Sequence, residues 1–273
     1  MKRRELDEGI NRIVINSILE IRSMHNIMGL KKIYNLLSPD WIGRDRFISI
    51  GMENGLGIRM LKSYQRTTFS AKSKWFVNLT SELSITSINQ VWVSDITYFR
   101  VGEIFYYLTF IVDVYSRRIL GYTAWESLHS EANCRTLKLA LSQRAGYNLH
   151  GLIHHSDRGS QYISNEYLKI LSDNEIAVSM CDSVYENTHI ERVNGIIKNE
   201  YLIYQPIKCY TDLKKRLKES VKLYNEERPH WSLKCKTPIE YERTLDEIPN
   251  ERRQVLRLYS EKPIGYVQET MFG

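Results

Sequence analysis

Three acidic residues stand where the surrounding sequence makes a carboxylate unusual or well placed. Asp95 lies inside a run of β-branched and aromatic residues, where charge is rare because central strand positions are mostly buried. Asp157 ends another apolar run, at the expected carboxyl edge of a sheet, where α/β proteins tend to build ligand sites. Glu191 lies in a stretch with helical spacing. Taken singly, each has an ordinary interpretation as a hydrogen-bonded strand residue, a turn residue or a solvated helix residue.

Taken together, these carboxylates predict a site for a hard divalent cation. Ionised carboxylates that lie close together repel one another, because unperturbed pKa values of about 3.9 to 4.3 leave all of them charged at neutral pH. Mg²⁺, with Mn²⁺ as a substitute, takes a few carboxylate oxygens together with waters and phosphate oxygens. Two such ions about 3.5 to 4 Å apart stabilise the attacking and leaving oxygens of an in-line phosphoryl displacement. The expected chemistry is phosphodiester cleavage and transfer, with Asp95, Asp157 and Glu191 as catalytic residues and metal ligands.

The helix that carries Glu191 is expected to begin near residue 187. Its apolar stripe comprises Ile190, Val193 and Ile197. A second face carries Glu191, Asn194 and Lys198, so that a carboxylate and an ammonium group face the same way. Glu186 is a rival for the third ligand, and it ranks lower because it precedes the helix and has no lysine at the equivalent spacing.

Alternating strands and helices are expected to position these residues. Apolar runs predict an antiparallel meander of three strands, within residues 91–101, 106–116 and 118–126. Further along the chain, the pattern predicts helices at 130–145, 165–174, 187–202 and 211–229, and strands at 152–157 and 176–181. Ser130 is the expected N-cap of the first of these helices. The sheet must then be mixed, and Pro229 and Pro238 are expected to restrict any further helix.

The front of the chain predicts a small helical unit. Residues 10–21 have mostly helical spacing, and residues 24–61 form short amphipathic stretches separated by glycine and Ser-Pro turns. Such helices suit a helix-turn-helix-like DNA-binding unit with four outward basic residues, Lys31, Lys32, Arg44 and Arg46. The expected organisation is a helical domain at 1–65, a linker at 66–88, a catalytic core at 89–245 and a C-terminal tail at 246–273.

The charge distribution is compatible with a polyanionic partner. The net charge is +6 and the sequence pI is about 9.0. Residues 1–75 hold 14 basic against 7 acidic side chains, and residues 192–236 hold 11 against 5. Solvated helix surfaces remain an alternative interpretation for both regions. No apolar run is long enough for a membrane helix and no signal peptide is recognisable, so a cytosolic protein with free thiols is expected.

Several strings resemble the type-three family of bacterial insertion-sequence transposases, which are relatives of retroviral integrases. LIHHSDRGSQY resembles the family's second-aspartate motif and VWVSDITYF its first-aspartate strand. VDVYSRRILGY, ENTHIER before KNEYL, and YNEERPHWSLKCKTPIEY agree in order and distance. The resemblance covers residues 88–242 strongly and 25–62 less tightly. It implies a ribonuclease-H-like fold, an α/β class with a mixed five-stranded sheet flanked by helices, in which Asp95, Asp157 and Glu191 match the acidic triad.

The resemblance also implies an activity and its partners. The expected enzyme is a DDE-type DNA transposase that cuts one strand at an insertion-sequence end with two Mg²⁺ ions and then joins the freed 3′-hydroxyl to target DNA. The expected partners are double-stranded DNA, further copies of this chain on that DNA, and possibly the product of an upstream reading frame, in the cytoplasm of a bacterium at the nucleoid. The basic and polar residues expected to hold DNA at the core are Lys198, Arg192, Arg158 and Gln161.

Two other functions are compatible with the sequence. The segment between Asp157 and Glu191 is shorter than is usual in the family, which favours a catalytically decayed or repurposed transposase acting only as a DNA-binding protein. A nuclease of the same fold would cut without joining. A zinc site at His154 and His155 is disfavoured, because neighbouring strand residues face opposite ways. Asp113 is interpreted as a structural partner of Arg117 or Arg118.

Overall fold

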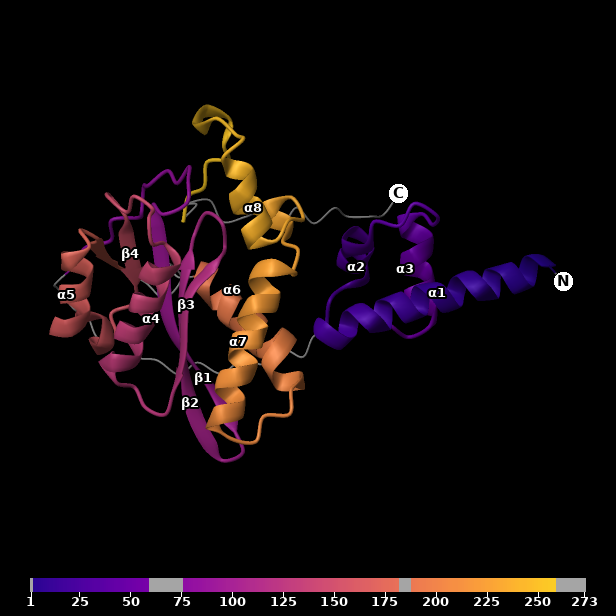
Figure 1. The fold of residues 1–273 in the computed structure, drawn as a ribbon, viewed down its shortest axis with the longest axis horizontal. Helices are drawn as coiled ribbons and strands as arrows, with labels where there is room; N and C mark the ends of the chain where they lie inside the picture. The colour runs from indigo at the N-terminus through magenta and orange to yellow at the C-terminus, as the bar shows by residue number, and fades with distance from the viewer. Residues whose placement is uncertain (1, 59–75, 182–187, 259–273) are drawn as a thin grey trace, which may run out of the picture.

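A mixed five-stranded sheet forms the centre of the larger part of the molecule (Figure 1). The computed structural model describes residues 2–58, 76–181 and 188–258. Its strands are β1 (Val91–Val101), β2 (Ile104–Asp113), β3 (Ile119–Trp125), β4 (Ile153–Ser156) and β5 (Ala177–Met180), in the order β3-β2-β1-β4-β5. The first three strands form the expected antiparallel meander, while β4 pairs in parallel with β1 and with β5.

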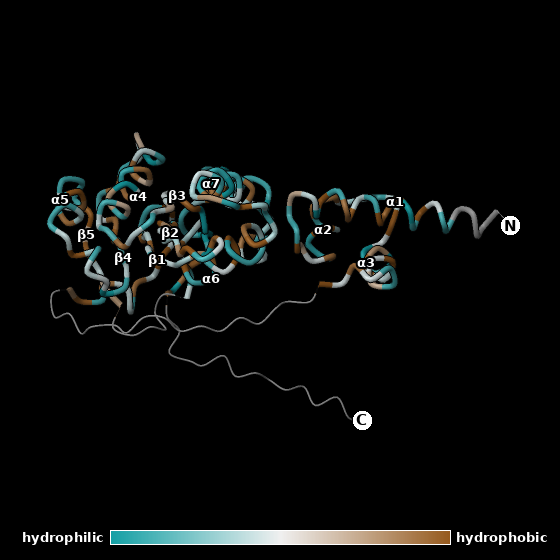
Figure 2. The backbone as a smooth tube through the Cα atoms, turned by 90° about the horizontal axis from the view of Figure 1, so that it is seen from below, coloured by the Kyte–Doolittle hydropathy of each residue, from teal (hydrophilic) through white to brown (hydrophobic). Residues whose placement is uncertain are grey.

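Helices cover both faces of this sheet, and Figure 2 shows the strands between α4 and α5 on one side and α6 and α7 on the other. The helices are α4 (Ser130–Gln143), α5 (Asn165–Asp173), α6 (Thr188–Ile196), α7 (Tyr210–Glu226) and α8 (Pro238–Leu245). Shorter turns are η1 (Ser160–Ile163), η3 (Ile197–Tyr201), η4 (Leu202–Tyr204), η5 (Trp231–Leu233) and η6 (Asn250–Arg252). Two cores result: Val91 and Val93 of β1 pack with α6 and α7, and Trp92 packs with α4 and α5. The fold is ribonuclease-H-like, as expected.

Gly121 allows α4 to pack closely on β3. A Cβ atom at this position would overlap the carbonyl oxygen of Thr136 in α4. The helix begins at Ser130 itself, and its N-cap is His129, which makes no capping hydrogen bond through its side chain. The expected Ser130 cap was therefore wrong by one residue, since helix boundaries are the least certain feature of a sequence pattern.

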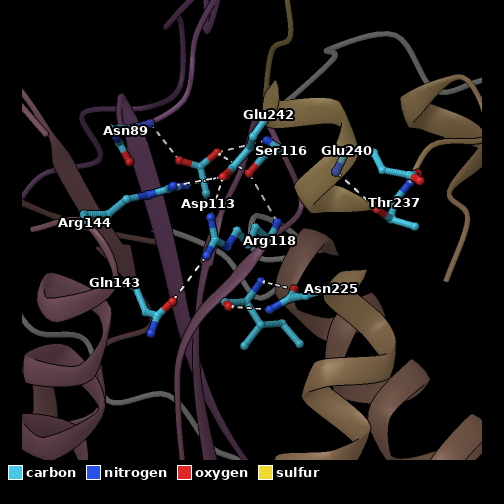
Figure 3. A network of polar contacts seen from close by, with 11 residues as sticks. Asn89, Asp113, Ser116, Arg118, Gln143, Arg144, Asn225, Thr237, Glu240 and Glu242 are labelled. Atoms are coloured by element: carbon cyan, nitrogen blue, oxygen red, sulfur yellow. Dashed lines mark hydrogen bonds and ion pairs between the residues drawn. The ribbon is translucent and has the colours of Figure 1, made fainter. Parts of the chain in front are cut away.

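A buried polar network joins the end of β2 to α4 and α8 (Figure 3). Asp113 accepts hydrogen bonds from the backbone N–H groups of Asn89, Tyr115 and Ser116. Arg144 forms a fork of two hydrogen bonds to Glu242, which also accepts one from Arg118 at 2.7 Å. The expected pairing of Asp113 with Arg118 was wrong, because backbone N–H groups supply the donors and Arg118 binds Glu242, while Asp113 influences Arg117 only through its charge.

Pro238 begins helix α8, although the sequence predicted that this proline would restrict further helix formation. Pro238 occupies the first helical turn, where its missing N–H costs nothing. Thr237 and Glu240 form a capping box, in which each side chain accepts a hydrogen bond from the other residue's backbone. Segments on both sides of the expected core also pack on it, since Ile85 and Leu256 form an antiparallel bridge and Leu258 is buried.

The smaller part of the molecule is a helical unit with its own core. It comprises α1 (Lys2–Met24), α2 (Leu30–Leu37) and α3 (Arg44–Glu53), which bury Val14, Ile18, Ile33, Phe47 and Ile50 together. Gly51 of α3 approaches α2, because a Cβ there would lie 2.8 Å from Cδ1 of Leu30. The expected helix at 10–21 is therefore part of a longer one. The first residues of the predicted linker, 66–75, lie outside the described part of the chain.

Candidate active site

Asp95 and Asp157 are placed side by side by the parallel pairing of β1 and β4. In that pairing Ser94 lies opposite Ser156; Asp95 is the next residue of β1, and Asp157 directly follows the end of β4. Side chains at matching positions of neighbouring strands point to the same face of a sheet, and strands lie about 4.8 Å apart. Both carboxylates are half-buried. The sheet therefore brings two of the three sequence-predicted acids together, on the face that α6 covers.

Helix α6 and the turn η3 that continues it are fixed on this face by two hydrogen bonds to β1. The Asn194 amide donates to Oδ2 of Asp95 at 2.6 Å, and the Lys198 ammonium donates to Oγ1 of Thr97 at 2.7 Å. The Lys198 ammonium also lies 5.4 Å from the centre of the Tyr98 ring. The predicted stripe of Ile190, Val193 and Ile197 is buried, which confirms the orientation of the helix. Glu191 is exposed, in the first turn of α6.

The pKa values at the site are displaced in the directions that clustered carboxylates produce. Burial raises the pKa of Asp95 to about 8, with further contributions from the negative charges of Asp157 and Glu191, against hydrogen bonds from Asn194 and the backbone of Ile96. Burial also raises the pKa of Asp157, although the N–H of Gly159 donates to its Oδ1 at 3.0 Å. Burial lowers the pKa of Lys198, and the charge of Asp95 opposes that change. The charges of Asp157, Glu191 and Lys198 thus all interact with Asp95.

The carboxylate and amide oxygens of this site are the ligand types that a hard cation prefers, although the three carboxylates do not converge on one position. In the part of the chain that the structure describes, no three His, Cys, Asp or Glu side chains lie close enough together to hold a metal ion. Burial and the charges of two further carboxylates nevertheless disfavour the ionised form of Asp95, which a bound cation would favour. Beside it, the buried Oδ1 of Asn194 has no hydrogen-bond partner among the described residues. Oxygen ligands short of positive charge are what Mg²⁺ or Mn²⁺ requires.

The helix after Glu191 departs from the sequence expectation. The pattern predicted one helix through residue 202, but a π-helical turn, η3, follows α6 and contains Lys198. Such turns are rare and are frequent at functional sites. No sequence signal identified it. Asn194 was expected on the correct face, but its bond to Asp95 was not predicted, although its spacing of three residues from Glu191 was the available signal. The rival ligand Glu186 lies outside the described residues.

The other predicted DNA-contact residues have different environments. Arg192 is exposed, while Arg158 is half-buried, and the Gln161 amide lies 3.4 Å from the carbonyl oxygen of Leu128. In the helical unit, Arg44 pairs with Asp45 and Arg46 pairs with Asp7. Lys31 is exposed over the Trp231 ring, but Lys32 is half-buried against the core, so its expected outward orientation was wrong. The reason is that α2 packs on the core through this face.

The two histidines before Asp157 face different partners. The His154 ring forms a hydrogen bond of 2.8 Å with Tyr167, and burial lowers its pKa to about 3. The His155 ring contacts the hydroxyl of Ser179 at 2.8 Å and the sulfur of Cys181 at 3.1 Å. Their alternating orientation follows from the period of two in a strand. Both rings are buried, on opposite faces of the sheet.

Comparison with known proteins identifies the class. Two family models described as integrase core domain match residues 86–185 and 175–238. The chain is 33% identical over 224 residues to the insertion element IS600 uncharacterized 31 kDa protein of Shigella sonnei, covering 78% of this chain and 81% of that protein. It is 28% identical over 179 residues to the transposase for insertion sequence element IS629 of the same organism, covering 64% of this chain and 60% of that protein. It is 34% identical over 119 residues to a protein of element IS986/IS6110 in Mycobacterium tuberculosis, spanning 43% of that protein.

Solved structures with the same kind of core include a magnesium complex of the catalytic core domain of HTLV-2 integrase. That domain is 22% identical, covers 57% of this chain and 97% of its own, and superposes with a TM-score of 0.44. The simian T-cell lymphotropic virus intasome, solved with a PP2A regulatory subunit, is 17% identical, covers 85% of this chain and 76% of its own, and superposes with a TM-score of 0.48.

The fold defines an integrase-type catalytic core. The chain belongs to the insertion-sequence transposases of the integrase-like family. Within the described ranges, no helix combines the length and the apolarity needed to cross a lipid bilayer.

Proposed function

We propose that this protein is a DNA transposase that cuts one strand at the end of an insertion sequence and joins the freed end to target DNA, with Asp95, Asp157 and Glu191 as metal ligands. The observation that carries the proposal is the placement of Asp95 in β1 next to Asp157 at the end of the parallel strand β4, under the helix that bears Glu191. The raised pKa of Asp95 supports it, since a divalent cation would supply the missing positive charge.

We propose that the site binds two divalent cations. When bound, these cations would neutralise charge at the scissile phosphodiester and polarise it. The chain's own residues position the groups around that phosphodiester. Asn194 orients the Asp95 carboxylate through its 2.6 Å hydrogen bond. Arg192 lies on the same helix as Glu191, and Lys198 lies on the π-helical turn that continues it. Both would hold backbone phosphates on either side of the reacting one.

The two reaction steps balance without a covalent intermediate on the protein. In the first, a water oxygen bonds to phosphorus and the P–O3′ bond breaks, so that a 3′-hydroxyl is released. In the second, that hydroxyl oxygen bonds to a target phosphorus, and a target 3′-oxygen leaves with the proton. Because transposases join two DNA segments, we further propose that several copies act together on double-stranded DNA at the bacterial nucleoid, with the product of an upstream reading frame as a partner.

The test is strand transfer on duplex oligonucleotides that carry the element ends, with Mg²⁺ or Mn²⁺. The wild-type protein should yield joined products, and Asp157→Asn should lose at least about a hundredfold in rate. Asp173→Asn, the same substitution at an exposed position at the end of α5, is the matched control and should retain activity. Joining by Asp157→Asn at the wild-type rate would refute the metal-site assignment. Cut products without joined ones would indicate a nuclease.

A further inference from the structure

Helix α2 of the helical unit brings a lysine against the catalytic core. The Lys31 ammonium lies 5.1 Å from the centre of the Trp231 ring, and the Asn35 amide lies 3.4 Å from the sulfur of Cys235. Near by, the His25 ring at the end of α1 lies 3.0 Å from the hydroxyl of Tyr201. These contacts turn the half-buried Lys32 toward the core segment that follows α7, where Arg228 and His230 lie.

Arg117 enters the same region from the turn between β2 and β3. Its backbone has φ of 62°, and its guanidinium donates to Nδ1 of His189 at the start of α6. The charge of Asp113 raises the pKa of Arg117, but the Asp113 carboxylate already accepts hydrogen bonds from backbone N–H groups of its own turn. Arg192 follows on α6, one residue after Glu191, and influences both Arg117 and Lys32.

The positive charges in this region exceed the negative ones. Arg228 is paired with Glu200 through two hydrogen bonds of 2.8 Å. Among the residues described, Lys32, Arg117 and Arg192 have no carboxylate within ion-pair distance. Four cations against two carboxylates, Glu200 and Asp113, leave a net charge of +2. Burial, together with the charges of Arg228 and Arg192 and against that of Glu200, lowers the pKa of Lys32 to about 8.

A buried, unpartnered imidazole nitrogen lies in this cluster. His230 is 8% exposed, its ring packs edge-on against Tyr224, and its Nε2 has no hydrogen-bond partner in the described ranges. Burial lowers the pKa of His230 to about 2, and Arg228, Lys32 and Arg117 act on it in the same direction. A neutral ring has one N–H and one acceptor nitrogen, and the His230 ring also forms a hydrogen bond with the backbone of Tyr224, so its tautomer decides whether Nε2 donates or accepts. Buried polar groups without partners commonly mark a ligand or water site.

We propose that Lys32, Arg117, Arg192 and Arg228 form one anion-binding site at the junction of the helical unit and the catalytic core, and that it holds a backbone phosphate of DNA. Guanidinium forks match phosphate oxygens in geometry, and an anion relieves the mutual repulsion of the four cations. Arg192 is exposed beside Glu191, so DNA bound at the carboxylates would pass this site. The identification of the anion as DNA, in place of free phosphate, rests on the proposed function.

The experiment measures duplex binding by fluorescence anisotropy at several salt concentrations, with EDTA so that cleavage plays no part. Arg117→Gln and Lys32→Gln should each bind about tenfold more weakly at near-physiological salt. The slope of log affinity against log salt should fall by about one for each cation removed. Lys169→Gln is the matched control, because it removes an exposed lysine on α5, at the end of the core away from the helical unit (Figure 1).

Melting temperatures without DNA separate loss of binding from loss of folding. Removal of one repelling cation should leave the melting temperature of Arg117→Gln and Lys32→Gln at or above the wild-type value. Inorganic phosphate should raise the melting temperature of the wild type more than that of either variant. Wild-type affinity and salt slope in both variants would overturn the proposal, even if phosphate protected the wild type.

The outcome is distinguishable from failure of the proposed function. A wild-type protein that binds duplex DNA through these cations but never joins strands would overturn the strand-transfer assignment and support the anion site. A wild-type protein that joins strands while both variants bind DNA normally would overturn the anion site alone.

Discussion

The amide of Asn194 in α6 donates a hydrogen bond to the carboxylate of Asp95 in β1, 99 positions earlier in the chain. Together with the bond from Lys198 to Thr97, it fixes the helix that bears Glu191 on the central strand. Glu191 itself makes no such contact and is exposed. The third carboxylate is thus positioned through its helix, and Asn194 is the residue on which that positioning depends.

Asn194→Ala should raise the pKa of Asp95 above about 8. The lost hydrogen bond stabilises the ionised carboxylate, and its removal leaves burial and the neighbouring charges unopposed by this amide. Carboxyl-carbon NMR across a pH titration measures the change, and the variant should also lose about 1 to 2 kcal/mol of unfolding free energy. Asn199→Ala, at an exposed position of η3, is the control. An unchanged Asp95 titration would contradict this role.

Asp157→Asn should be no less stable to heat than the wild type when metal is absent. Because the pKa of Asp157 is raised in the folded protein, ionisation of this group destabilises the fold as pH rises above its unfolded value of about 3.9. The advantage of the variant should therefore be small at pH 4 and larger at pH 8. Melting temperatures in EDTA at the two pH values measure it. A clearly lower melting temperature at pH 8 would count against clustered carboxylates.

The contact between His25 and Tyr201 should weaken in acid. Burial, with help from Arg228, lowers the pKa of His25 to about 4, so the folded protein binds fewer protons than the unfolded chain between pH 6.5 and 4. Stability from this group is present above pH 6.5 and is lost as pH falls through about 4, by up to roughly 3 kcal/mol.

The corresponding variant is His25→Asn, which keeps a polar group near Nδ1 but does not titrate. It should lose less unfolding free energy than the wild type between pH 7 and pH 4.5, measured by chemical denaturation. His150→Asn, at an exposed histidine, should follow the wild type. Parallel curves for His25→Asn and the wild type would show that His25 does not titrate as expected.

Gly121→Ala should destabilise the core by about 1 to 3 kcal/mol or more, because the added methyl group meets the backbone carbonyl of Thr136, which cannot rotate away. Gly9→Ala, in α1 with open space around it, is the control and should be neutral or stabilising by about 0.5 to 1 kcal/mol. Urea denaturation measures both. Equal stability of the two variants would mean that α4 shifts away from β3 at little cost.

The sequence carried most of the information on the sheet and on two of the acids. Strand patterns placed Asp95 within one strand and Asp157 at the end of another, because β-branched and aromatic runs are local signals, and the stripe on α6 followed from helical spacing. The parallel pairing that makes the two acids neighbours was not predicted. The π-helical turn at Lys198, the helix after Pro238 and the inward orientation of Lys32 depend on tertiary contacts, which no local pattern contains. The cluster around Arg117 escaped prediction for the same reason, since its members are distant in the chain.

Both outer strands of the sheet have backbone groups already bound by other parts of the chain. The Asn225 side chain accepts a hydrogen bond from the N–H of Ile119 in β3 and donates one to its carbonyl oxygen. The Tyr210 hydroxyl donates to the carbonyl oxygen of Ala124. On the opposite border, the N–H of Met180 in β5 donates to the carbonyl oxygen of Val77. Unpaired strand borders are where chains add to one another and precipitate. These bonds therefore protect the sheet from edge-to-edge aggregation.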